Sequence, residues 1–196
     1  QFINRVSKGT YELGSVFKPF TFAAALNMKL IEPSTEFLDL PKSINCAGFP
    51  IREYDEKLPK NLTAEQILVR SGNIGSVRIA QKVGEEKFKS FLEKIGVIGE
   101  INFDIDEIAV YDDFSMGKCK LATASFGHGI ATTLLQLAKG YAVISNGGYS
   151  VNPKLILSES NEKKGKKELI LNKDVSEKIV NILRKVVTNE EGTAGL

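Results

Sequence analysis

Ten residues, Tyr11-Glu12-Leu13-Gly14-Ser15-Val16-Phe17-Lys18-Pro19-Phe20, hold a serine and a lysine three positions apart at the predicted start of a helix. Three positions are nearly one helical turn, so the side chains of Ser15 and Lys18 are expected on one face. A serine hydroxyl needs a nearby base to become nucleophilic, and a lysine amine in apolar surroundings is such a base. Because a free lysine has a pKa of about 10.4, this role requires burial that lowers the pKa toward neutrality. The pattern predicts acyl transfer through a serine ester.

The residues around this pair predict both the helix start and its apolar setting. Gly14 can adopt backbone angles that lead into a helix, and Pro19 is tolerated in a first turn, where N–H groups lack intrahelical partners. Ser15 would then lie at the positive end of the helix dipole, which stabilises a developing oxyanion. The segment 21–26 is predicted to continue as a helix buried on all sides. The rings expected to desolvate the amine are Phe17, Phe20 and Phe22.

The Ser-x-x-Lys spacing occurs twice more, and neither match has the context that this chemistry needs. Ser115 and Lys118 follow an acidic pair and flank a glycine, which is typical of a turn. Ser160 and Lys163 lie in a charged stretch that is predicted to be a solvated loop. Since a short motif is only as specific as its structural context, we assign the chemistry to the first pair.

A second polar group, Ser71-Gly72-Asn73, lies between two helical patterns. A short turn between helices would project both polar side chains from one rigid point. Ser71 could then relay a proton between the lysine and a leaving amine, and Asn73 could bind a substrate amide. The alternative interpretation is an ordinary polar turn between two helices.

With their flanking residues, these motifs resemble the penicillin-binding, serine β-lactamase-like superfamily, and in particular the class B penicillin-binding proteins. The order is the same, with Ser-x-x-Lys at 15–18 followed by Ser-x-Asn at 71–73. Further similarity lies in Asn4-Arg5, Ala122–Ile130, Thr132–Ala138 and Asn146-Gly147-Gly148. The segment around Phe126-Gly127-His128-Gly129 is most similar to the cell-division, or septal, branch.

This resemblance implies a peptidoglycan D,D-transpeptidase of septal cell-wall synthesis, with an α+β fold of the penicillin-binding-protein type. Ser15 would attack the D-alanyl-D-alanine carbonyl of a stem peptide, and its backbone N–H would form half of the oxyanion hole. Lys18 would act as the base for this attack. Ser71 would relay a proton, and Asn73 would bind the substrate as a donor. β-Lactams would acylate the same serine, and neither a cofactor nor a metal is implied.

The partners implied by the resemblance are peptidoglycan stem peptides, β-lactam antibiotics and septal cell-division proteins. The implied location is the periplasmic face of the bacterial inner membrane, reached through an anchor upstream of Gln1. No nucleic-acid partner is expected, because the net charge is only +2 and one lysine cluster at 163–167 is interrupted by glycine. With 196 residues, of which 42% are hydrophobic, the chain can bury one core.

One motif of the family is missing from this sequence. Lys-Thr-Gly does not occur, and Gly192-Thr193-Ala194, which resembles the loop before it, follows Glu191. We therefore expect 1–196 to be a partial transpeptidase domain, an internal fragment that ends before this motif and lacks most of the central antiparallel sheet. Such a fragment is predicted to be inactive alone and to carry an apolar helix face that the sheet would cover.

The remaining reactive residue types are interpreted as structural. Cys46 and Cys119 fit no metal-ligand spacing, and we favour two separate thiols over a disulfide. His128 is flanked by Gly127 and Gly129, which indicates a close backbone passage near the site rather than the base of a triad. An acidic stretch is expected to be a solvated loop without a metal, and it contains Asp104, Asp106, Glu107, Asp112 and Asp113.

Hydrophobic periodicity predicts helices at 15–29, 64–70, 74–82, 85–95, 118–125, 133–146 and 174–188, and strands near 43–46, 51–54, 154–158 and 168–171. Capping boxes are predicted for Thr63 with Gln66 and for Asp174 with Glu177. Gly96 is predicted to cap the C-terminus of the helix at 85–95.

Two other functions remain open at this point. A serine β-lactamase or β-lactam sensor shares the Ser-x-x-Lys motif, and fast turnover of penicillin would favour it. The Ser-x-Asn motif at 71–73 and the similarity over 122–148 weigh against it. A non-catalytic helical scaffold or divisome-binding module is the other alternative. Partner binding by a Ser15→Ala variant, without acylation of either form, would favour that interpretation.

Overall fold

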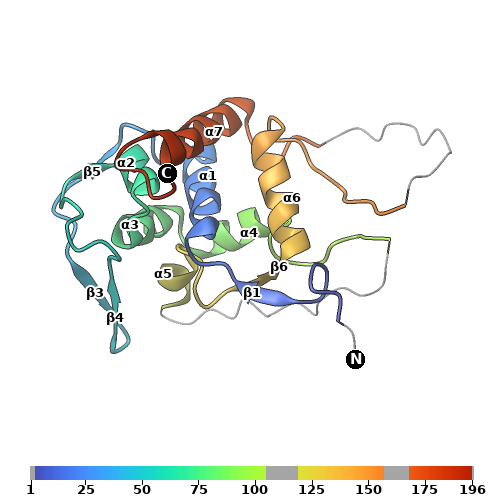
Figure 1. Cartoon of the computed structure of the whole chain (residues 1–196), viewed down its shortest axis with the longest axis horizontal. Coiled ribbons are helices and arrows are strands. Elements are labelled where there is room, and N and C mark those ends of the chain that lie inside the picture. Colours follow the sequence, from blue (N-terminus) through green and yellow to red (C-terminus); the bar gives the residue numbers. More distant parts are fainter. Residues whose placement is uncertain (1–2, 105–118, 157–167, 196) are drawn as a thin grey trace.

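The computed structural model describes residues 3–104, 119–156 and 168–195 (Figure 1). Its strands are β1 (Thr10–Glu12), β2 (Glu36–Phe37), β3 (Ser43–Cys46), β4 (Phe49–Arg52), β5 (Leu62–Thr63) and β6 (Ala131–Thr133). Its helices are the 3-10 helix η1 (Gly14–Phe17) and α1 (Lys18–Asn27), α2 (Ala64–Val69), α3 (Asn73–Val83), α4 (Glu85–Ile95), α5 (Lys120–Ala124), α6 (Leu134–Ser145) and α7 (Lys173–Thr188). The other two Ser-x-x-Lys matches, the lysine cluster and most of the acidic stretch lie outside the described residues.

Helix α1 forms the centre of the molecule, and every residue from Lys18 to Leu26 is buried. It packs against α2, α3, α4 and α7, and Figure 1 shows α2 and α3 on one side of it and α6 on the other. The rings of Phe17 and Phe20 meet edge to face at 5.4 Å, and Phe20 meets Tyr141 of α6 at 5.2 Å. The prediction of a helix buried on all sides at this position is confirmed.

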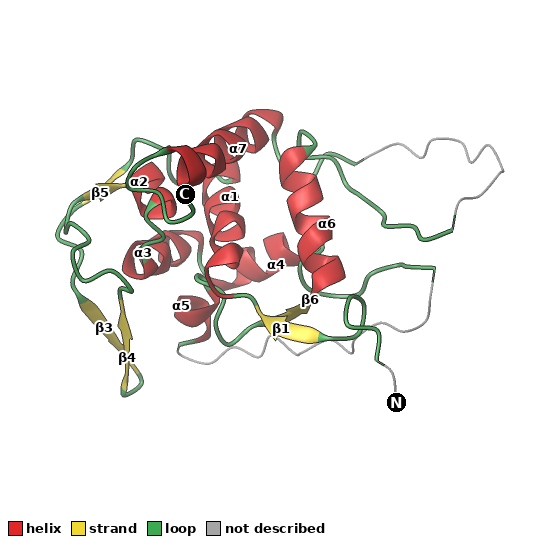
Figure 2. Cartoon of the chain, viewed as in Figure 1, coloured by secondary structure: helices red, strands yellow, loops and turns green. Residues whose placement is uncertain are grey.

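The strands form three separate antiparallel pairs at the edges of the helical body (Figure 2). β1 pairs with β6, with Thr10 opposite Thr133, and β2 pairs with β5. β3 and β4 form a hairpin with Cys46 opposite Phe49. The described part of the chain is therefore helix-rich with short strands, as the predicted α+β class requires.

The helices lie close to the predicted positions, with one error at a helix start. Thr63 and Gln66 form the predicted capping box of α2, and Gly96 caps α4 in the left-handed conformation, with φ 76°. The predicted capping box at the start of α7 is wrong, because that helix begins one residue earlier, at Lys173. Its N-cap is Asn172, which makes no side-chain capping bond, so Asp174 lies inside the first turn.

The strands were harder to predict. β3 has the predicted bounds, but β4 begins two residues before the prediction, because Ala47 and Gly48 both adopt positive φ and make a tight hairpin. The predicted strand at 168–171 is reduced to one bridge between Leu169 and Tyr149, and residues 154–156 form no strand. β1, β2, β5 and β6 were not predicted, since two or three residues carry no periodic signal.

The two cysteines form a disulfide, which corrects the expectation of separate thiols. Their Cα atoms are 5.6 Å apart, within the range that a disulfide spans. The physical reason is the fold around them: Cys46 ends β3, and Cys119 is the N-cap of α5, which packs against the same helix, α3, as β4 does. This proximity depends on a loop arrangement that the spacing in the sequence does not encode.

Within the described residues, none of the helices is both long enough and apolar enough to cross a membrane. Residues 3–104, 119–156 and 168–195 also contain no group of three or more His, Cys, Asp or Glu side chains placed to hold a metal ion.

Candidate active site

The site is organised around the buried amine of Lys18, the first residue of α1. This side chain is only 1% exposed. Its Nζ atom donates to the backbone oxygen of Ser71 at 2.5 Å and to Ser71 Oγ at 2.8 Å. A third bond runs to Asn73 Oδ1 at 2.8 Å. The structure therefore brings together Lys18, Ser71 and Asn73 from two distant parts of the chain.

Burial changes the acid–base chemistry of this amine. Desolvation lowers the pKa of Lys18 to about 8, and the negative charge of Glu53 opposes that effect. Removing a cation from water disfavours its charged form, whereas a nearby carboxylate favours it. At pH 7 roughly one molecule in ten would then carry a neutral Lys18, compared with fewer than about one in a thousand for a free lysine. The amine is thus available as a base near neutrality.

Ser15 lies one turn before this lysine and faces solvent. It belongs to η1, and its backbone oxygen accepts the N–H of Lys18. Ser15 is exposed, and it lines a cavity of about 820 Å³ together with Ser71, Asn73 and His128. The predicted nucleophile Ser15 therefore lines the same cavity as Ser71 and Asn73, the two residues to which Lys18 is bonded.

A glycine in the segment before β6 holds the turn that carries this serine. Gly127 accepts a bond from the Gly14 N–H at 3.0 Å and has a φ of +81°. A Cβ atom on Gly127 would lie 2.1 Å from the Gly14 oxygen, so only glycine fits there. The predicted close backbone passage around His128 is confirmed. The His128 ring lies beside Phe126, with ring centroids 5.1 Å apart.

The turn between α2 and α3 explains how Ser71 and Asn73 reach the amine. Ser71 has a φ of 54°, in the left-handed region, and Asn73 is the first residue of α3. A Cβ on Gly75 would lie 2.5 Å from Ile67, so the two helices approach closely at the turn. Asn73 Nδ2 donates to the Arg52 oxygen at 2.9 Å, which leaves one amide hydrogen for a substrate.

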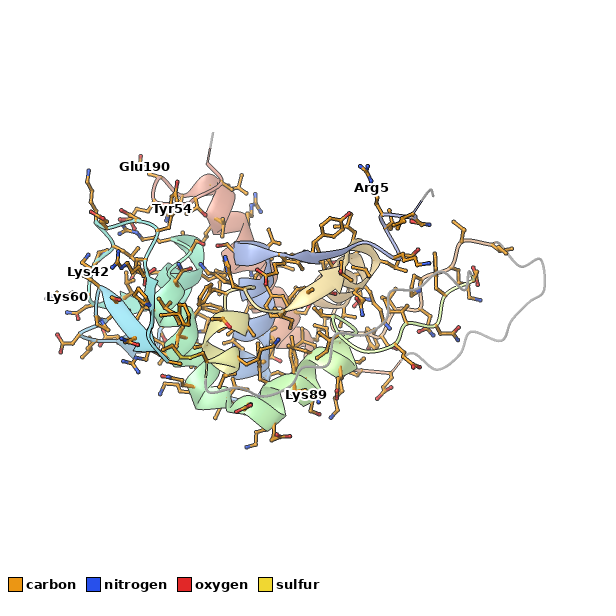
Figure 3. The ribbon with its side chains drawn as sticks, turned by 90° about the horizontal axis from the view of Figure 1, so that it is seen from below. Arg5, Lys42, Tyr54, Lys60, Lys89 and Glu190 are labelled. Atoms are coloured by element: carbon orange, nitrogen blue, oxygen red, sulfur yellow. A yellow bond between two sulfur atoms is a disulfide. The ribbon has the colours of Figure 1, made fainter. Side chains whose placement is uncertain are left out.

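Several residues of the cavity were missed by sequence reasoning. Glu53 accepts two backbone N–H bonds at the start of α3. Arg70 is held by Glu191 at 3.1 Å and Asp55 at 3.5 Å. The segment 52–57 is rich in charge, and the strand predicted near 51–54 gave no sign that its side chains line a site. Figure 3 shows two other residues that line the cavity, Tyr54 and Glu190, on the same side of the molecule.

A further missed contact lies behind the serine turn. The Tyr141 hydroxyl donates to the Val16 oxygen at 2.8 Å, which joins α6 to η1. Desolvation raises the pKa of Tyr141 to about 12, so this hydroxyl keeps its proton at neutral pH. No periodic signal distinguishes such a tyrosine from an ordinary core residue.

An exposed serine at a helix start, above a buried lysine that is partly neutral, has the parts that acyl transfer through a serine requires. The chain belongs to the family of the penicillin binding protein transpeptidase domain, whose family model matches residues 1–195. Together with the structural neighbours below, this establishes the predicted α+β, transpeptidase-type fold.

Relatives with curated names agree with this family. The chain is 27% identical over 190 residues to a "Peptidoglycan D,D-transpeptidase FtsI homolog" of Mesostigma viride, covering 90% of this chain and 32% of the relative. It is 26% identical over its whole length to a "Probable peptidoglycan D,D-transpeptidase FtsI" of Caulobacter vibrioides, of which it covers 33%. The chain thus spans about a third of the length of these relatives.

Solved structures show the same fold. A peptidoglycan glycosyltransferase from Burkholderia ambifaria matches with a TM-score of 0.86 and 23% identity, over 98% of this chain and 61% of that one. Penicillin binding protein 3 from Mycobacterium tuberculosis, complexed with aztreonam, matches with a TM-score of 0.83 and 23% identity, over 99% of this chain and 46% of that one.

Proposed function

We propose that this chain carries the acylation site of a peptidoglycan D,D-transpeptidase, with Ser15 as nucleophile and Lys18 as its base. The observation that carries the proposal is the buried Lys18 amine, bonded to Ser71 and Asn73 beneath the cavity that Ser15 lines. Membership of the transpeptidase family supports the reaction class.

In the proposed reaction, Ser15 Oγ attacks the carbonyl of the penultimate D-alanine while its proton passes to the neutral Lys18 amine. The protonated Lys18 then passes that proton to the Ser71 hydroxyl, which gives its own proton to the nitrogen of the departing D-alanine as the peptide C–N bond breaks. A second stem amine attacks the resulting ester, releases Ser15 and forms the cross-link. Asn73 orients the lysine through Oδ1 and offers its remaining amide hydrogen to the substrate.

The proposal extends to septal cell division at the periplasmic face of the inner membrane, with septal cell-division proteins as partners. Its support is the FtsI name carried by relatives from Mesostigma viride and Caulobacter vibrioides. We further propose that Lys-Thr-Gly, which this sequence does not contain, is needed for efficient acylation, so that 1–196 alone acylates slowly or not at all.

The direct test is mass spectrometry after incubation with a penicillin. The samples are this chain, a longer polypeptide that continues through a Lys-Thr-Gly strand, and Ser15→Ala in both. We expect a stable adduct on Ser15 in the longer polypeptide, and none in either Ser15→Ala variant. A folded longer polypeptide without an adduct would contradict the proposal and favour the scaffold. An adduct that is rapidly lost would favour a β-lactamase.

A further inference from the structure

Glu53 lies directly after β4 and caps a helix that has no capping side chain of its own. Its Oε2 atom accepts the Asn73 N–H at 2.6 Å, and its Oε1 atom accepts the Ile74 N–H at 2.8 Å. These are the first N–H groups of α3, which have no partner within the helix. The N-cap residue is Gly72, so the cap has to come from elsewhere.

The local packing explains why an ordinary N-cap side chain is absent. A Cβ atom on Gly72 would lie 3.3 Å from Leu58 and 3.4 Å from Ile67, which leaves little room for a serine or aspartate. Glu53 supplies the missing acceptors from the hairpin instead. A carboxylate at this place is also favoured by the positive end of the α3 dipole.

The same strand end fixes the side chain of Asn73. Its Nδ2 atom donates to the oxygen of Arg52, the residue before Glu53. With the amide nitrogen held there, the orientation of the amide plane is fixed, and its oxygen accepts from Lys18 Nζ at 2.8 Å. The backbone N–H and the side chain of Asn73 are thus clamped by two consecutive residues.

We propose that Glu53 is a positioning residue, which orients Asn73 toward Lys18 and provides the fixed negative charge that faces the Lys18 amine. The inference rests on the proposed function only for the importance of that amine. Other charged or titratable groups around the cavity are Arg52, Tyr54, Asp55, Arg70, His128, Glu190 and Glu191. Among them Arg70 is paired with both Asp55 and Glu191, so one of the two negative charges is offset and these three residues keep a net charge of −1.

The first test measures the pKa of Lys18 from the ¹³Cε chemical shift, in the unaltered chain and in Glu53→Gln. Glutamine keeps the size of the side chain but removes the charge that raises the pKa of Lys18. We expect the Lys18 pKa to fall by roughly one pH unit. The matched control is Glu56→Gln, an exposed residue of the same segment, which should leave the Lys18 pKa unchanged.

The conservative variant Glu53→Asp keeps the charge and should keep the Lys18 pKa near that of the unaltered chain. A cap with a purely structural role would change the unfolding temperature in Glu53→Gln without moving the Lys18 titration, and that result overturns the proposal. If Glu53→Gln does not fold, the contact of Glu53 with the start of α3 is tested in the unaltered chain. Its Asn73 and Ile74 amide protons should exchange slowly with solvent, because both donate to Glu53, and rapid exchange of both protons would overturn the contact.

These measurements use no substrate or penicillin. They give the same answer in a Ser15→Ala background, so failure of the proposed acylation and failure of this inference are separate results.

Discussion

Lys18 Nζ has three oxygen acceptors within 2.8 Å, which match the three hydrogens of a protonated amine. To act as a base, the amine must give up one of them and free a lone pair. Desolvation makes the loss of this proton easier, because it lowers the pKa of Lys18 to about 8. Burying this lysine therefore lowers the stability of the fold and at the same time provides a base.

The lowered pKa of Lys18 predicts that the stability of the fold depends on pH. The folded-state pKa of about 8 is below the ordinary 10.5, so between these values the unfolded chain binds a proton that the folded chain does not. The free energy of unfolding should therefore rise with pH across this window, by up to about 3 kcal/mol. Tyr141, whose pKa is raised to about 12, acts oppositely above pH 10.

Urea denaturation at several pH values between about 7 and 10 measures this effect. The matched variant is Lys18→Met, in which the rise over this window should largely disappear. Equal pH profiles for the two proteins would show that the folded-state pKa of Lys18 is not lowered.

A second residue-scale prediction concerns Gly127→Ala. The new Cβ would meet the Gly14 oxygen at 2.1 Å, and φ is +81°, so both a clash and backbone strain are expected. We expect a loss of more than about 2 kcal/mol of stability and a displaced Ser15 turn. The control is Gly84→Ala, with φ +78° and nothing within 4 Å of the new atom, which adds backbone strain without a clash and should therefore cost less than Gly127→Ala. If chemical denaturation showed equal losses of stability in the two variants, the close approach of Gly127 to the Gly14 oxygen would be ruled out.

At the scale of elements, the β3–β4 hairpin links the disulfide to the site. Cys46 at the end of β3 is bonded to Cys119 at the start of α5, and the residues at and after the end of β4 clamp the first residue of α3. The helices alone therefore do not position Asn73; the hairpin must also be in place.

Replacing both cysteines by serine should lower the free energy of unfolding by about 2–4 kcal/mol, because the bridge closes a loop of 73 residues. Thermal unfolding of the oxidised protein, the reduced protein and the double variant measures this. The Asn73 amide resonance should broaden or shift in the reduced and double-variant proteins. Identical melting curves with and without reductant would contradict a stabilising bridge.

Some of these elements were predictable from the sequence, and others were not. The helix pattern of α1 and the turn at 71–73 were predictable, because periodicity and motif order are local properties. Glu53, Arg70 and the disulfide were not, because their contacts join residues that are distant in the sequence. The β4 start was misplaced for a different, local reason: two adjacent residues with positive φ, one of them an alanine, form the hairpin turn.

At the scale of the whole molecule, the buried helix α1 carries the proposed base, and the 3-10 helix before it, η1, carries the exposed Ser15 as the proposed nucleophile. The apolar helix face expected from the sequence stays a prediction. Exposed large apolar side chains on α6 and α7 include Leu134, Val180 and Val187. Their contacts in a longer polypeptide would test it.

The most direct test of the central claim is the pH dependence of Ser15 acylation by a penicillin, measured in the longer polypeptide that contains Lys-Thr-Gly. Only the neutral form of Lys18 can take the serine proton, so the rate should rise about tenfold per pH unit below pH 8 and level off above it. Lys18→Met should remove both the pH dependence and most of the rate. A rate that is independent of pH from about 6 to 9, or a Lys18→Met variant that acylates normally, would contradict the account.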